Sequence, residues 1–382
     1  MTSNLNNRVT CYPINQEDKT MENNTTINLP QAIEFTRAVG DQVTPLVVGD
    51  KGFGKTSALK ELGKAFPDHH LAYFDCTTKD VGDMLIPKIK SQSEVDYVSF
   101  APNEEFGLHT GKPIILMLDE IGKANTSVKN ALMRIMLERQ IGGYKLPEGS
   151  IVFATTNKAN EGIGDLLQDH HRDRVVVINL RKPTNEEWID WAISNNIHSS
   201  VLGFAKEFPQ IFQAHEEVKE ANDNPYIYHP NLQRECFVTG RSLEMASKVI
   251  TRCEEYNIPK GVMKIVLMGT IGQRGAVDLM AFIELADQMP RRADIIAKPK
   301  ETIVPDNPSI KAMVVFNALA SMSKEFVTPW FDYFIRLDKE FQAMFIKGVM
   351  PAKYHARELV FKHPKFGEWA RENNYMFQAD KV

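Results

Sequence analysis

The chain has 382 residues, which is room for two or three domains at about 150 residues each. With 43% hydrophobic and 25% charged residues and a net charge of -4, it has the composition of an ordinary soluble protein rather than of a chain coated in basic residues. Its four cysteines (Cys11, Cys76, Cys236 and Cys253) are too scattered for a disulfide framework or a zinc site. No apolar run approaches the roughly 18 residues that span a bilayer, and the polar start lacks a secretory signal. We therefore exclude secreted, membrane and disulfide-stapled classes and expect a cytoplasmic protein.

Residues 1–27 are polar and predict a flexible arm. In residues 28–183, short apolar runs without polar alternation are separated by helical or loop stretches, which favours strands buried on both faces and hence a parallel sheet flanked by helices. We predict this α/β core from five runs: Pro45–Val48, Leu71–Phe74, Ile114–Leu118, Ile151–Ala154 and Val175–Ile178.

A phosphate-loop pattern, G-x-x-x-x-G-K-[ST], lies directly after the first of these runs and before a helical stretch. Its glycines let successive backbone N–H groups point at one anion. Lys55 would then reach the β- and γ-phosphates of ATP, and the Thr56 hydroxyl would ligate Mg²⁺. The candidate nucleotide-binding residues are Gly49, Asp50, Lys51, Gly52, Phe53, Gly54, Lys55, Thr56 and Ser57.

Two adjacent carboxylates, Asp119 and Glu120, follow the third apolar run. A buried strand delivers such a pair to the carboxyl edge of the sheet, where open α/β folds bind ligands. We expect Asp119 to hold the Mg²⁺ shell and Glu120 to polarise a water for in-line attack on the γ-phosphate. An Asp-Glu pair can also be a helix N-cap with a first-turn acid, but the phosphate loop upstream favours the catalytic interpretation.

Polar residues also flank the last two strands. Asn157 ends the fourth and would orient the attacking water or sense the γ-phosphate, the alternative being a turn-forming asparagine. Arg172 and Arg174 precede the fifth, where they would be far from their own phosphates but available to those of a neighbouring subunit. The alternative for these two arginines is solvated charge.

After residue 183 the strand signal stops, and we predict a helical lid over 184–289 and a helical C-terminal extension over 290–382. Arg241 stands at the start of a lid helix, where a cation opposes the macrodipole preference, so a role beyond local stability is indicated. An aromatic stripe in the last predicted helix indicates packing, with a peptide groove as the alternative. The predicted helices are Glu186–Ile193, Ser242–Tyr256, Gly275–Gln288, Ile310–Met322 and Trp330–Val349.

Taken together, these residues resemble an AAA+ ATPase of the MoxR-like branch, over about residues 29 to 285. The supporting stretch runs from Leu118-Asp119-Glu120-Ile121 through Glu138-Arg139-Gln140 and Leu146-Pro147-Glu148 to Asn157. Residues 82–107 lie where that family inserts a β-hairpin, and residues 94–100 alternate as a hairpin strand does.

The resemblance implies a role for each candidate residue. Asn157 would be the first sensor, Arg241 the second sensor reaching from the lid, and Arg174, with Arg172 as the other candidate, the arginine finger donated to a neighbour. The chain departs from the family pattern at Gly122 and Lys123, where the family has Asn and Arg. It also has a glycine where a proline usually precedes the second sensor.

The function that follows is Mg²⁺-dependent ATP hydrolysis by a ring-forming ATPase that remodels a protein partner. The resemblance implies a homo-oligomeric ring, expected to be a hexamer, and a von Willebrand A-type protein as client. A nucleic-acid motor or loader is one alternative, for which Lys88, Lys90, Arg139 and Lys145 would supply positive charge. An ATP-switched interaction scaffold is the other. A plain P-loop kinase is disfavoured, because the polar groups at the sheet edge suit water as the nucleophile.

Overall fold

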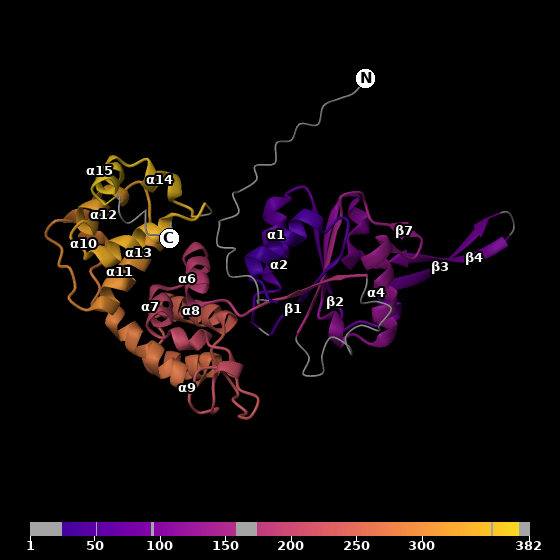
Figure 1. Cartoon of the computed structure of the whole chain (residues 1–382), viewed down its shortest axis with the longest axis horizontal. Helices are drawn as coiled ribbons and strands as arrows, with labels where there is room; N and C mark the ends of the chain where they lie inside the picture. Colours follow the sequence, from indigo (N-terminus) through magenta and orange to yellow (C-terminus); the bar gives the residue numbers. More distant parts are fainter. Residues whose placement is uncertain (1–24, 51, 93–94, 158–173, 353, 374–382) are drawn as a thin grey trace, which may run out of the picture. The chain divides into compact units, whose positions relative to one another are not determined.

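The computed structural model describes residues 25–50, 52–92, 95–157, 174–352 and 354–373 (Figure 1). Its chain divides into two compact units, each considered separately below. One is formed by Met1–Lys51 and Lys55–Arg181, and the other by Gly52–Gly54 and Lys182–Val382. The predicted lid and extension both belong to the second unit.

A five-stranded parallel sheet forms the centre of the first unit. β1, β5 and β8 are buried at every position, which explains why their sequences are apolar without alternation. After β1 the chain crosses to β2 at the edge of the sheet, and the later strands β5 and β8 fill the space between β2 and β1. The carboxyl ends of β5, β8 and β1 are therefore adjacent. All five predicted strands are confirmed. In spatial order they are β2 (His70–Asp75), β5 (Ile114–Asp119), β8 (Ile151–Thr156), β1 (Pro45–Val48) and β9 (Val176–Asn179).

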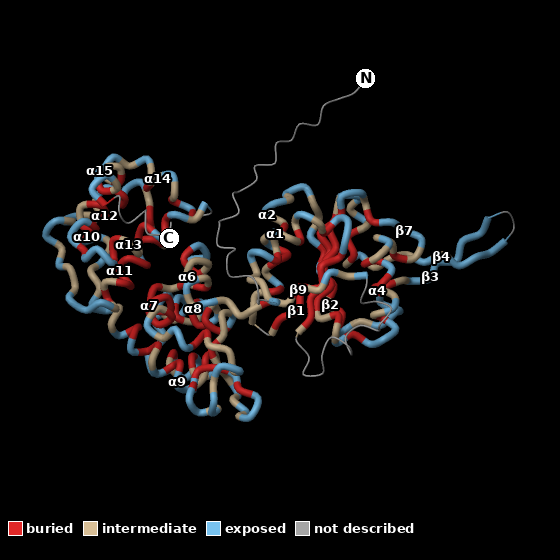
Figure 2. The backbone as a smooth tube through the Cα atoms, viewed as in Figure 1, coloured by how far each residue is buried: buried red, intermediate tan, exposed pale blue. Residues whose placement is uncertain are grey.

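Helices cover both faces of this sheet, whose strands are the buried centre of the unit in Figure 2. On one face, α1 (Leu29–Val39) and α2 (Ser57–Ala65) pack against the odd-numbered side chains of β5 and β8. On the other face, α4 (Thr126–Glu138) packs against the even-numbered ones. The fold class expected from the sequence, a parallel α/β sheet with a phosphate loop followed by a helical region, is confirmed.

A β-hairpin interrupts the connection between β2 and β5, as the sequence predicted. Its strands, β3 (Leu85–Gln92) and β4 (Val95–Pro102), pair antiparallel and are exposed along most of their length (Figure 2). A smaller hairpin, β6 (Gln140–Ile141) and β7 (Tyr144–Lys145), follows α4. Among its described residues, the short helical segments of this unit are α3 (Val81–Met84), η2 (Glu104–Phe106), η3 (Leu108–Thr110) and η4 (Ile121–Lys123).

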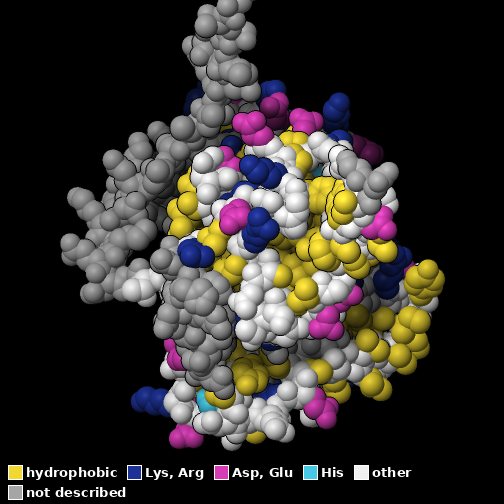
Figure 3. All heavy atoms as spheres, turned by 90° about the vertical axis from the view of Figure 1, so that its right-hand side faces the viewer, with side chains coloured by type: hydrophobic (Ala, Val, Ile, Leu, Met, Phe, Trp, Pro, Cys, Tyr) yellow, Lys and Arg dark blue, Asp and Glu magenta, His cyan; other side chains and the backbone are white. Residues whose placement is uncertain are grey.

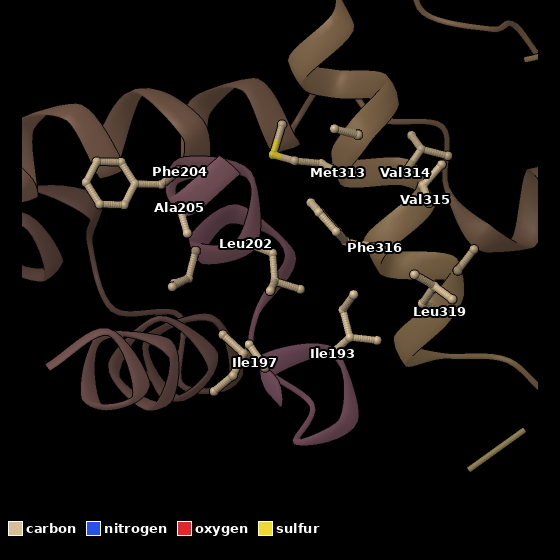
Figure 4. Packing of buried hydrophobic residues seen from close by; sticks show 14 of the residues in the cluster. Ile193, Ile197, Leu202, Phe204, Ala205, Met313, Val314, Val315, Phe316 and Leu319 are labelled. Atoms are coloured by element: carbon tan, nitrogen blue, oxygen red, sulfur yellow. The ribbon is translucent and has the colours of Figure 1, made fainter. Parts of the chain in front are cut away.

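The second unit is helical and has one continuous hydrophobic core, which extends from Trp188 to Trp369. Figure 4 shows α7 and α11 packing side by side within it. Gly203 allows this approach, since a Cβ there would lie 2.9 Å from the Met313 side chain. The segments predicted as lid and extension therefore share their apolar interior. The helices are α6 (Asn185–Ser194), α7 (Ser199–Glu207), η6 (Pro209–Phe212), η7 (His215–Glu217), α8 (Gly240–Glu255), α9 (Lys260–Ala286), α10 (Arg292–Ala297), α11 (Pro308–Ala320), α12 (Val327–Phe334), α13 (Lys339–Val349), α14 (Arg357–Phe361) and α15 (Pro364–Glu372).

Two predicted helices differ from those observed. Trp330–Val349 is two helices, α12 and α13, because Asp338 is extended and the Gln342 side chain donates hydrogen bonds to the carbonyls of Ile335 and Leu337. The aromatic side chains of this stretch are buried, which confirms packing and leaves no groove at them.

The other difference concerns α9, which starts well before the predicted residue 275. Its backbone breaks at Gly272, where φ is 80°. By length and composition alone α9 could cross a membrane, but its side chains at Met263, Leu267 and Leu279 are buried in the core of the unit.

Candidate active site

The phosphate loop connects β1 to α2 at the carboxyl edge of the sheet. Gly52 and Gly54 have φ angles of 86° and 81°, a region that residues with a Cβ rarely adopt. Thr56 is the N-cap residue of α2, yet its side chain makes no capping hydrogen bond to that helix. The loop thus leads into a helix N-terminus, where backbone N–H groups and the helix dipole favour an anion. Lys51 lies outside the described residues.

Lys55 links this loop to the end of β8. Its Nζ donates to the carbonyl oxygens of Gly49 at 2.5 Å and Asp50 at 3.2 Å, and to Oδ1 of Asn157 at 2.6 Å. Burial lowers the pKa of Lys55 to about 8, although the nearby carboxylate of Glu120 opposes the shift. The ammonium therefore directs its donors at the loop carbonyls and at Asn157, from where they could turn to other oxygen acceptors.

Glu120 completes a hydrogen-bonded chain that begins at Lys55. Nδ2 of Asn157 donates to Oε1 of Glu120 at 2.6 Å, and Nζ of Lys123 lies 3.0 Å from Oε2. Glu120 has a φ of 53°, a left-handed conformation that costs a residue with a Cβ about 1–2 kcal/mol. The residues predicted to bind phosphate, to sense it and to activate water are thus brought together.

Asp119 is the buried member of the carboxylate pair, with 8% of its surface exposed. Its Oδ1 accepts hydrogen bonds from the Thr155 hydroxyl and from the backbone N–H of Glu120, the latter at 3.1 Å. Its Oδ2 accepts one from the Tyr73 hydroxyl at 2.8 Å. Both oxygens are therefore held by neighbouring groups.

The donor set suits a divalent cation. In the part of the chain that the structure describes, the hydrogen-bond donors to Asp119 are uncharged, and no cationic side chain lies within 4 Å of its carboxylate. A buried carboxylate without a cationic partner is costly, and Mg²⁺ prefers oxygen ligands of this kind. The Asp119 carboxylate is accordingly fitted to hold magnesium, and the Thr56 hydroxyl, which makes no capping hydrogen bond, remains the second ligand predicted from the sequence.

Of the three predicted arginines, Arg174 is the one that the structure places relative to the site. Arg174 is exposed and lies at the amino end of β9, whereas the site is at the carboxyl ends of the neighbouring strands. The four residues of β9 lie between Arg174 and the edge that carries the phosphate loop, and at 3.3 Å per residue they span about 13 Å. Arg172 lies outside the described residues. Arg241 is exposed in the first turn of α8, in the other unit, and its position relative to the site remains a prediction.

Three side chains at the site were not predicted: Tyr73, Thr155 and Lys123. Side chains alternate between the two faces along β2 and β8, which places Tyr73 and Thr155 on the same sheet face as Asp119. This alternation is the sequence signal that could have predicted them. Lys123 was noted only as a departure from the family pattern. Arg139, one of the basic residues expected to be available to nucleic acid, is instead half-buried, and its guanidinium donates to the carbonyl oxygens of Gly40 and Met136.

Comparison with known proteins bears on the fold alone. No protein-family model matches the chain, and no curated protein matches it. Among solved structures, a mutant of RuvB from Thermotoga maritima is similar at 17% identity and a TM-score of 0.36, covering 72% of this chain and 74% of that one. NtrX from Brucella abortus is similar at 12% identity and a TM-score of 0.32, covering 84% and 67%. The RuvB Holliday junction branch migration motor from Thermotoga maritima is similar at 16% identity and a TM-score of 0.35, covering 71% of this chain and 73% of that one.

Proposed function

We propose that this chain is an ATPase of the AAA+ class, similar to the MoxR-like branch, which hydrolyses ATP with Mg²⁺ and uses the energy to remodel a protein partner. The observation that carries the proposal is the hydrogen-bonded chain from Lys55 through Asn157 to Glu120 at the carboxyl edge of the sheet. It joins a phosphate-binding cation to a carboxylate base through a sensing amide.

Each of these side chains has a part in the reaction. Bound ATP offers Lys55 phosphate oxygens, which form stronger charge-assisted hydrogen bonds than the carbonyl of Gly49 does. When Lys55 turns to phosphate, Asn157 loses one partner, and its amide can orient a water beside Glu120. Glu120 then accepts a proton as this water attacks the γ-phosphate. Asp119 and Thr56 would hold Mg²⁺, which would supply positive charge to offset that of the phosphates.

Assembly into a ring is supported by the position of Arg174. Because a strand's length separates it from its own site, it can act only on the nucleotide of a neighbouring copy. We propose Arg174, or Arg172, as the finger, Arg241 as the lid arginine, and a hexamer as the ring. Arginine fingers are worth on the order of 10³–10⁵ in rate, so hydrolysis would depend on assembly.

The exposed hairpin of β3 and β4 supports a protein client. Ile89 and Val98 lie opposite each other with 79% and 54% of their surfaces exposed, and Phe100 follows on the same face. Lys88 and Lys90 occupy the other face. Figure 3, which views the molecule from the side to which the hairpin points, shows hydrophobic and charged side chains intermixed there. The apolar stripe formed by Ile89, Val98 and Phe100 suits contact with a polypeptide better than contact with a phosphate backbone. We propose a von Willebrand A-type protein as the client.

The decisive test is Glu120→Gln, which keeps the shape of the side chain and removes the base. We expect ATP binding to stay within about twofold of wild type and phosphate release to fall at least about 100-fold, the usual contribution of a general base. Fluorescent-nucleotide binding and phosphate release measure the two quantities. Glu138→Gln, an exposed glutamate on α4, serves as the matched control and should leave both unchanged. Failure of the wild type to bind ATP with Mg²⁺ would contradict the proposal.

A further inference from the structure

Tyr73 reaches the active site from the edge strand of the sheet. In β2 it pairs in register with Met117, two residues before Asp119 on the adjacent strand β5. Residues two apart on a strand share a face, so Tyr73 and Asp119 lie on the side of the sheet that α2 covers. The phenol donates its hydrogen bond across this step to Oδ2 of Asp119, at 2.8 Å.

The bond from Tyr73 completes the fixation of the Asp119 carboxylate. Thr155 and the backbone N–H of Glu120 hold Oδ1, while the phenol holds Oδ2, so the carboxylate is held from two sides against rotation. Each carboxylate oxygen has two lone pairs. Oδ2 therefore keeps one for a cation or a cation-bound water, in a direction that Tyr73 sets.

Packing does not account for a tyrosine at this position. The side chain is 42% exposed, and a phenylalanine would give β2 the same apolar ring. A phenol keeps its proton at neutral pH, and here the hydroxyl donates it to Oδ2 of Asp119 at 2.8 Å. The hydroxyl is thus the part of the residue that the site uses.

We propose that Tyr73 is a positioning residue that sets the magnesium affinity of the site by orienting Asp119. The inference rests on the proposed function, because it assumes that Asp119 holds Mg²⁺. Hydrogen-bond partners of metal ligands typically change metal affinity about 10–100-fold when removed. Tyr73 would accordingly act on Mg²⁺ and leave the contacts of Lys55 with phosphate untouched.

The experiment compares wild type with Tyr73→Phe, using a fluorescent ATP analogue. Its affinity is measured in EDTA and then as Mg²⁺ is added, which gives the Mg²⁺ concentration for half-maximal tightening. For Tyr73→Phe we expect this concentration to rise about tenfold, with the affinity in EDTA unchanged. Tyr97→Phe is the matched control, since Tyr97 is also 42% exposed but lies on the hairpin, and it should behave as wild type.

The outcomes separate this inference from the proposed function. If Tyr73→Phe shows the wild-type Mg²⁺ requirement, the inference is wrong while the ATPase proposal stands. If Tyr73→Phe weakens nucleotide binding equally in EDTA and in Mg²⁺, or if its weaker binding comes with a clear fall in the melting temperature of the free protein, Tyr73 has a structural role. The inference is then again overturned. If wild type itself shows no Mg²⁺-dependent binding, the proposed function fails first.

Discussion

Lys55 is a cationic side chain whose burial costs the folded protein stability. The side chain is 7% exposed, and burial lowers its pKa from 10.5 to about 8. Below pH 8 the folded protein therefore holds a buried ammonium whose desolvation is only partly offset by three hydrogen bonds. A phosphate ligand would supply the missing charge.

This pKa predicts how stability depends on pH. Between pH 8 and 10.5 the unfolded chain keeps the Lys55 proton while the folded chain releases it, so the free energy of unfolding rises with pH in this window. Lys55→Met lacks this group. From pH 7.5 to pH 10, wild type should therefore gain about 2 kcal/mol of stability relative to Lys55→Met.

Urea denaturation of both proteins at the two pH values measures this difference, in which the titration of all other groups largely cancels. Lys60→Met, an exposed lysine on the helix α2 that follows Lys55, is the control and should follow wild type at both pH values. A constant difference between wild type and Lys55→Met would show that Lys55 keeps its proton in the folded state.

At this scale, the sequence predicted residues that belong to a local pattern. The phosphate loop and the Asp-Glu pair are recognisable because backbone geometry requires those residue types at that spacing. Tyr73 and Thr155 belong to no such pattern; they reach Asp119 through strand pairing, from 46 and 36 residues away. Lys123 is close in sequence to Glu120, but only the turn of η4 shows that the two charges meet.

Among the elements, the hairpin of β3 and β4 makes the most direct prediction. Asparagine at both Ile89 and Val98 removes the centre of the apolar stripe without disturbing a core, so stability should change by less than about 0.5 kcal/mol per site. If the stripe contacts the client, an unfolded polypeptide such as casein should accelerate ATP turnover by wild type and fail to accelerate that of the double variant. Basal turnover should be equal.

Ile303→Asn provides the matched control, because Ile303 is 80% exposed and belongs to the helical unit. It should be stimulated by casein as wild type is. Equal stimulation of wild type and the double hairpin variant would show that the client binds elsewhere.

Sequence patterns predicted the bounds of strands better than those of helices. Buried parallel strands were predicted to within about two residues, because a strand enclosed on both faces leaves no choice but apolar residues. Helices were less well bounded. The break between α12 and α13 depends on Gln342, whose side chain binds carbonyls at the end of α12, a contact that helical spacing cannot reveal.

For the whole molecule, the question is whether one copy completes the site of another. Glu120 and Arg174 lie at opposite ends of the sheet, so one active site would combine Glu120 of one copy with Arg174 of the next. Glu120→Gln chains keep the arginine, and Arg174→Ala chains keep the base. Each variant alone should therefore hydrolyse ATP poorly, for a different reason.

Mixing the two variants turns this arrangement into a measurement. In a 1:1 mixture that assembles at random, a site is complete when its own chain carries Glu120 and its neighbour carries Arg174, which gives about a quarter of the wild-type rate. Phosphate release from the mixture, compared with each variant alone, tests this. Recovery with Arg172→Ala in place of Arg174→Ala would identify the other arginine as the finger. If neither mixture recovers although both variants enter rings, or if Arg174→Ala and Arg172→Ala are each fully active alone, catalysis does not pass between copies.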